Sequence, residues 1–154
     1  MVHSYYKQTL SMFKEPAKQV GWVDEKTQKL RYLMLTQISD LNGCSVLDVG
    51  CGLGDLSAYL IEQDLDVTYE GIDVMPDMIQ KAEERHPDNA FFCEDFLSES
   101  CTRRADFILA SGAFSIRRDD DQDAYLQDVI AKLFKQAHQG VAFNLLSKQS
   151  PDGQ

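Results

Sequence analysis

From residue 45 onward, short apolar runs alternate with segments whose apolar residues recur at helical spacing. The apolar runs predict strands at residues 45–49, 67–73, 90–94, 105–111 and 140–146. The intervening segments predict helices at residues 55–63, 76–85 and 123–139. Strands that alternate with helices form a mostly parallel sheet, because parallel neighbours need crossover connections. The sequence therefore predicts an α/β fold in which helices cover both faces of an open, mostly parallel sheet.

Two helical segments are expected before the first strand. Residues 1–20 predict a short helix that ends in a turn at Gly21. Residues 24–41 predict a second helix with one buried apolar stripe, formed by Leu30, Leu33, Met34, Ile38 and Leu41. We therefore divide the chain into an N-terminal helical cap, residues 1–44, and one α/β domain, residues 45–154. The connection over residues 95–104 is short for a crossover helix, so its structure stays open.

Composition excludes several classes of protein. The chain has 154 residues, of which 44% are hydrophobic, enough for the core of one domain. Its formal net charge of -10 argues against a broad nucleic-acid surface, which would need an excess of Lys and Arg. No apolar run has the length of a membrane span, so a soluble, cytoplasmic protein without a membrane partner is expected. The four cysteines form no CxxC pair, and neither a metal site nor a disulfide framework is predicted.

A glycine-rich loop follows the first predicted strand, with glycine at Gly50, Gly52 and Gly54. In parallel sheets, ligands bind at the carboxyl ends of the strands, where glycine lets the backbone approach the ligand closely. Dinucleotide-binding loops have the pattern GxGxxG, and its third glycine is replaced here by Asp55. A carboxylate at the start of a helix would repel a pyrophosphate. The loop therefore favours a ligand without phosphate groups.

The stretch VLDVGCGLGDL, followed by GIDVMPDMIQKAEER, closely resembles the first two motifs of class I S-adenosylmethionine-dependent methyltransferases. The resemblance extends over about residues 24–147, with the later strands in the family's order. It implies a Rossmann-like sheet with strand order 3-2-1-4-5 and S-adenosylmethionine as the cofactor. The family's usual C-terminal antiparallel hairpin is expected to be missing, because the sequence ends eight residues after Leu146. Two interpretations stay open: the chain is an N-terminal portion of a longer protein, or it is a minimal form of the fold.

The resemblance also implies roles for residues of the first two motifs. Gly50 and Gly52 correspond to backbone contacts with the methionine part of the cofactor. Cys51, between them, is included in this cofactor-binding loop as a small packing residue rather than a nucleophile. Asp48 corresponds to the acid near the cofactor's ammonium group, with a buried, loop-bonded acid as the alternative. Asp73 corresponds to the acid that accepts both ribose hydroxyls, with simple helix capping as the alternative.

Further cofactor contacts follow from the later motifs. Val74 and Met78 match apolar positions that pack on the adenine. Asp95 matches the residue that accepts a hydrogen bond from the exocyclic amine of the adenine. The backbone N–H of Phe96 matches the group that donates to a ring nitrogen of the adenine. Ser111 lies where the family's fourth motif faces the methionine chain and the transferring methyl group.

Residues outside these motifs allow two interpretations. Arg31 could meet the methionine carboxylate, and Tyr5, Tyr6 and Trp22 could cover the cofactor, although core packing or a solvated helix face is the simpler expectation for each. Phe114, three residues after Ser111, could border the site or be a core aromatic.

The resemblance implies transfer of the sulfonium methyl group to an unidentified acceptor. The residues SGAF at 111–114 lack the paired prolines of many exocyclic-amine methyltransferases of nucleic acids, and a small-molecule substrate is favoured. The sequence identifies no catalytic base. A non-catalytic module that binds S-adenosylmethionine or another nucleoside within a complex is the alternative, and an NAD-dependent oxidoreductase is a third. A homodimer through the edge of the fifth strand is a further hypothesis.

Overall fold

A computed structural model describes residues 2–21, 24–114 and 122–145 of the chain. In chain order the elements are α1 (Val2–Met12), α2 (Pro16–Gln19), α3 (Glu25–Thr36), β1 (Cys44–Val49), α4 (Asp55–Glu62), β2 (Val67–Asp73), α5 (Pro76–Arg85), β3 (Ala90–Cys93), β4 (Ala105–Ala110), α6 (Gln122–Gln136) and β5 (Ala137–Phe143). The strands form one sheet in the order β3-β2-β1-β4-β5, and every neighbouring pair is parallel. The predicted fold class and strand order are confirmed.

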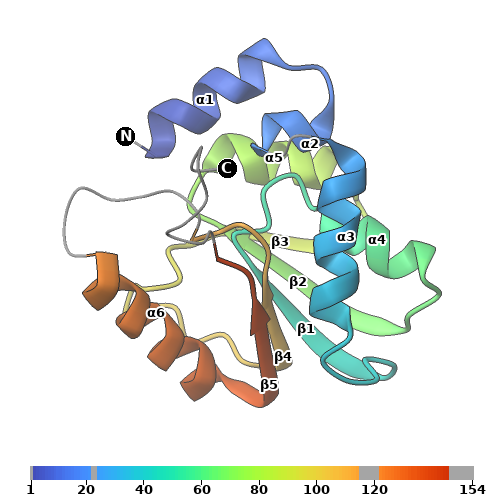
Figure 1. Cartoon of the computed structure of the whole chain (residues 1–154), viewed down its shortest axis with the longest axis vertical. Coiled ribbons are helices and arrows are strands. Elements are labelled where there is room, and N and C mark those ends of the chain that lie inside the picture. Colours follow the sequence, from blue (N-terminus) through green and yellow to red (C-terminus); the bar gives the residue numbers. More distant parts are fainter. Residues whose placement is uncertain (1, 22–23, 115–121, 146–154) are drawn as a thin grey trace.

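Helices cover both faces of the sheet: α3, α4 and α5 pack on one face and α6 on the other (Figure 1). Successive strand residues point to opposite faces. Val46 therefore packs in the core beneath α3, α4 and α5, whereas Leu47 packs in the core beneath α6. Each is only 1% exposed, as expected for a central parallel strand buried on both sides.

The boundary between α6 and β5 corrects the sequence prediction. Residues 137–139 were expected to end the helix, but Ala137 already pairs with Ala105 of β4. The register then shifts, and Gly140 pairs with Phe107. The helix ends at Gln136, whose side-chain amide donates to the Cys101 carbonyl at 2.8 Å. Pairing with β4 therefore outweighs the helical pattern over these three residues.

The predicted apolar stripe of α3 is also wrong in part. Leu30, Leu33 and Met34 are 57%, 42% and 62% exposed. The side chains of α3 that are buried instead are Gln28, Tyr32 and Leu35. The Gln28 amide donates to the Asp55 carboxylate, and the Tyr32 ring packs on Tyr59 with centroids 5.6 Å apart. Because of these contacts with α4, the face of α3 that carries Gln28 and Tyr32 points into the core.

The connection between β3 and β4 contains no helix. Side chains hold it instead: the Arg103 guanidinium pairs with Glu94 at 2.7 Å and with Glu70 at 3.0 Å, and it lies over the Phe92 ring. Lys132 of α6 donates to the Ser98 carbonyl at 2.6 Å. These contacts anchor a crossover that is too short for a helix. Within the described ranges, no helix is both long enough and apolar enough to span a membrane.

Candidate functional site

The glycine loop joins the carboxyl end of β1 to α4 and is closely packed. The Gly50 and Cys51 N–H groups both donate to the Ile72 carbonyl, at 2.8 and 3.0 Å. Gly50 has φ +74°, and a Cβ there would lie 2.6 Å from the Cβ of Ala113. A Cβ at Gly54 would lie 2.7 Å from the Phe91 ring. The loop thus requires glycine both for its conformation and for contact with the ends of neighbouring elements.

Asp73 ends β2 directly beside this loop. Its Oδ2 accepts the Gly52 N–H at 3.0 Å, and its Oδ1 accepts the Met75 N–H at 2.9 Å. Each oxygen of a carboxylate can accept more than one hydrogen bond. The half-buried Asp73 side chain therefore holds the glycine loop against the carboxyl end of β2.

Asp48 lies beneath the loop on the same strand, and its side chain is deeply buried. The residue is 2% exposed, and its Oδ2 accepts the Tyr69 hydroxyl at 2.7 Å. Burial raises the pKa of the Asp48 carboxyl to about 7, and the Tyr69 hydrogen bond opposes that rise. The Asp48 carboxyl therefore lies beneath the glycine loop and is not exposed on the surface of the loop.

Asp55 begins α4 and is engaged by two other elements. Its Oδ1 pairs with Arg85 of α5 at 2.6 Å, and its Oδ2 accepts the Gln28 amide at 3.3 Å. Arg85 also donates to the Leu53 carbonyl in the loop. The negative charge at the helix start is therefore largely paired, which weakens the argument that Asp55 would repel a pyrophosphate.

The predicted adenine contacts lie on both sides of the β2 and β3 ends. The Glu94 N–H donates to the Asp73 carbonyl at 3.0 Å, which brings the residues after β3 next to Asp73. Asp95 is exposed, and its Oδ1 accepts the Leu97 N–H at 3.0 Å. The Phe96 ring is buried, while its backbone N–H has no hydrogen-bond partner among the described residues. Val74 is 42% exposed and adjoins Asp73.

Met78 differs from Val74, because it is buried in a small core beneath α1. It is 2% exposed and packs with Leu53 and Met75, against which Tyr6 and Val20 of the N-terminal segment also lie. An adenine contact would require this small core to open.

The N-terminal segment reaches the site itself. Burial, the Asp73 charge and the neighbouring Tyr5 raise the pKa of Tyr6 to about 12. A Cβ at Gly52 would lie 2.9 Å from the Val20 side chain. Tyr5 is 46% exposed, and Trp22 lies outside the described residues.

The ends of β4 and β5 contain one residue that the sequence analysis missed. The Asn144 side-chain oxygen accepts the Gly112 N–H at 2.7 Å, and its amide nitrogen donates to Ser111 Oγ at 3.4 Å. No local motif marks Asn144, because its partners lie more than 30 positions earlier. Phe114 is 7% exposed and packs edge-on against Phe143, which favours its interpretation as a core aromatic.

Arg31 and Cys51 are the remaining predicted contacts. Arg31 is half-buried on α3, one turn after Gln28, which contacts the start of α4. Cys51 is 8% exposed, and burial together with Asp48 and Asp73 raises the pKa of its thiol well above the ordinary value. A protonated thiol suits the packing role expected for Cys51.

Comparisons with known proteins agree with this arrangement. The methyltransferase domain family matches residues 46–136. The chain is 33% identical over 112 residues to "Putative methyltransferase Rv1506c" of Mycobacterium tuberculosis, covering 69% of this chain and 65% of that protein. It is 27% identical over 132 residues to magnesium-protoporphyrin O-methyltransferase of Rhodobacter capsulatus, covering 82% of this chain and 56% of the relative. The chain thus spans less than two thirds of the length of these relatives.

A solved structure shows the same fold. It is that of the N-methyltransferase NodS from Bradyrhizobium japonicum with S-adenosyl-L-homocysteine, with a TM-score of 0.69 and 20% identity over 92% of this chain and 71% of that one. The match to the family covers the glycine loop, β2 with its terminal acid, and α6. The chain therefore belongs to the methyltransferase domain family.

Proposed function

We propose that this chain binds S-adenosylmethionine and transfers its methyl group to a small-molecule acceptor. The observation that carries the proposal is Asp73, whose carboxylate lies against the glycine loop at the carboxyl ends of β1 and β2. A carboxylate there is suited to a ribose diol, and each such charge-assisted hydrogen bond contributes about 1.5–3 kcal/mol. The Phe96 N–H, which has no partner in the described ranges, and the exposed Asp95 fit a purine edge.

The bound cofactor would supply an activated methyl group, and the protein would supply alignment and exclusion of water. Asp73 would orient the ribose while holding the glycine loop. Gly50 and Gly52 would let the loop backbone approach the methionine part. Ser111, at the end of β4, would border the methyl group. No general base is required when the acceptor is already nucleophilic.

A small-molecule acceptor agrees with the names of two relatives. One is the magnesium-protoporphyrin O-methyltransferase, and another is a trans-aconitate 2-methyltransferase of Rhodopseudomonas palustris, 38% identical over 68 residues. The acidic composition, with a net charge of -10, argues against a nucleic-acid acceptor.

Calorimetric titration with S-adenosylmethionine, S-adenosyl-L-homocysteine and NAD tests the cofactor. We expect binding of the first two and none of NAD. Tight binding of NAD alone would overturn the proposal in favour of an oxidoreductase. Incubation of cell extract with cofactor labelled in the methyl group, followed by separation by size, tests the acceptor. Label in the small-molecule fraction is the expected result, and binding without any transfer would favour the non-catalytic module.

Two structural predictions belong to this proposal. The cap of residues 1–44 would cover a cofactor bound by the domain of residues 45–154, as the contacts of Tyr6 and Val20 suggest. A second copy would pair with β5, which pairs only with β4 among the described residues. Sedimentation velocity at high concentration tests the homodimer, and a monomer would contradict it.

A further inference from the structure

Tyr69 lies where its hydroxyl can reach across the sheet to the glycine loop. In the register between β1 and β2, Val46 pairs with Tyr69 and Asp48 pairs with Gly71. Residues two apart on a strand share a face, so all four side-chain positions face the same core. The Tyr69 side chain therefore runs diagonally to Asp48, and its hydroxyl donates to Oδ2 at 2.7 Å.

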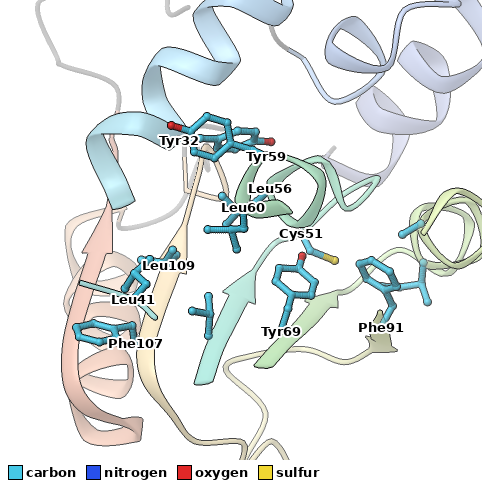
Figure 2. Packing of buried hydrophobic residues seen from close by; sticks show 13 residues of the cluster. Tyr32, Leu41, Cys51, Leu56, Tyr59, Leu60, Tyr69, Phe91, Phe107 and Leu109 are labelled. Atoms are coloured by element: carbon cyan, nitrogen blue, oxygen red, sulfur yellow. The ribbon is translucent and has the colours of Figure 1, made fainter. Parts of the chain in front are cut away.

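Gly71 makes this diagonal contact sterically accessible. A Cβ at Gly71 would lie 2.9 Å from the Tyr69 hydroxyl and 3.0 Å from the Cys51 Cβ. The tyrosine hydroxyl thus occupies the space that the missing side chain leaves open. Figure 2 shows the Tyr69 hydroxyl directed toward Cys51 in the glycine loop. Tyr69 therefore contacts the loop and its buried acid together.

The surroundings of Asp48 are acidic or weakly polar. The pKa of Asp48 is affected by Tyr69 and Asp73 of β2 and by Asp55 of α4. Asp48 in turn affects the pKa of Cys51 in the loop and of Tyr32 on α3. On the other side, β4 presents Leu109, which pairs with Asp48. The Tyr69 hydroxyl is the one hydrogen-bond donor to the Asp48 side chain among the described residues, and Oδ1 is left without one.

We propose that Tyr69 is a positioning residue for the cofactor's ammonium group and acts through Asp48. By donating to Oδ2, the tyrosine holds the carboxylate charge beneath the glycine loop and leaves Oδ1 for the ligand or a bridging water. Removing the hydroxyl should make the Asp48 carboxylate harder to ionise, because no other group in the described part of the chain donates a hydrogen bond to it. This inference rests on the proposed function, since it requires a cationic ligand above the loop.

The experiment compares wild type and Y69F by calorimetric titration with S-adenosyl-L-homocysteine between pH 6 and 9.5. Burial raises the pKa of Asp48 to about 7 in the wild type. If the variant raises it by about one further unit, its affinity should be about fivefold lower at pH 7 and equal to wild type by pH 9.5. The ligand's own titration cancels in this ratio. A D48N variant should bind more weakly than wild type at high pH and lose the pH dependence due to Asp48.

Tyr59 provides a matched control, because it is also a buried tyrosine, 5% exposed, without a hydrogen bond to Asp48. Y59F should follow wild type at every pH. A Y69F affinity that equals wild type throughout, or that is lower by a constant factor at every pH, would overturn the positioning role.

A ligand-free measurement separates this inference from the proposed function. A 13C NMR titration of the Asp48 carboxyl should show a midpoint about one pH unit higher in Y69F than in wild type. An unchanged midpoint overturns the role of Tyr69 whether or not the cofactor binds. Absence of S-adenosyl-L-homocysteine binding by the wild type would instead overturn the proposed function, and with it the positioning role.

Discussion

The two halves of the site are held together in different ways. At the ends of β1 and β2, carboxylates bind groups 21 positions away in the chain: Asp73 accepts the Gly52 N–H, and Asp48 accepts the Tyr69 hydroxyl. At the ends of β4 and β5, the Gly112 N–H depends on Asn144, 32 positions later. The two halves meet where Ala113 packs on Gly50. The contacts of the proposed cofactor half thus join residues of two recognisable motifs, whereas the other half depends on Asn144, which no motif marks.

The largest expected effect is in the first half, at Asp73. D73A should weaken binding of S-adenosyl-L-homocysteine by about 3–5 kcal/mol, because two charge-assisted hydrogen bonds to the ribose are lost. Calorimetry measures the affinity. D73N is the control, because it keeps one acceptor oxygen for the backbone. It should fold normally and still lose at least about tenfold in affinity. Unchanged affinity in both variants would remove Asp73 from the site.

The next largest effect, on stability, is expected at the contact of Gly50 with Ala113 that joins the two halves. G50A should lower the free energy of unfolding by about 2–4 kcal/mol, because φ is +74° and the new Cβ would overlap Ala113. Urea unfolding measures the change.

Gly43 supplies the control for this substitution. It has φ +73° but no atom within 4 Å of an added Cβ, so G43A should cost only about 1 kcal/mol. The double variant G50A/A113G should recover the difference between the two. Equal losses in G43A and G50A would show that the halves are not coupled through this contact.

The ionised Asp48 carboxylate should lower the free energy of unfolding, although it should contribute to cofactor binding. Its folded-state pKa of about 7 lies above the ordinary 3.8, so the folded protein holds its proton more tightly than the unfolded chain. This contribution to stability is present below about pH 4 and is lost as the pH rises toward 7. D48N should therefore be about 1–3 kcal/mol more stable than wild type at pH 8, relative to their difference at pH 4. Thermal unfolding at the two pH values measures it, and a pH-independent difference would contradict it.

The smallest effect is expected in the second half, at Asn144. N144A removes the acceptor for the Gly112 N–H and should cost about 1 kcal/mol. Amide hydrogen exchange should show faster exchange at Gly112, while N144D, which keeps an acceptor oxygen, should retain protection. Equal protection of Gly112 in all three proteins would show that Asn144 does not hold this loop.

Much of the fold could be predicted from sequence, because the strands are buried and carry continuous apolar runs. The bounds of β2 and α5 agree with the prediction to the residue. The predictions that were wrong concern elements whose orientation or ends depend on a distant partner. Spacing indicates that α3 has an apolar stripe, but the contacts of Gln28 and Tyr32 with α4 decide which face is buried. Similarly, pairing of Ala137 with Ala105 ends α6 early.

The sequence by itself determined the α/β alternation, the glycine loop and the acid at the end of β2, because each follows from residues that are close together in the chain. Only the tertiary structure decided what surrounds the acids. It placed Tyr69 on Asp48, Arg85 on Asp55 and Asn144 on Gly112. Hydrogen bonds and ion pairs depend on distances between side chains of different elements, and these distances arise only when the sheet aligns its strands and the helices pack on it.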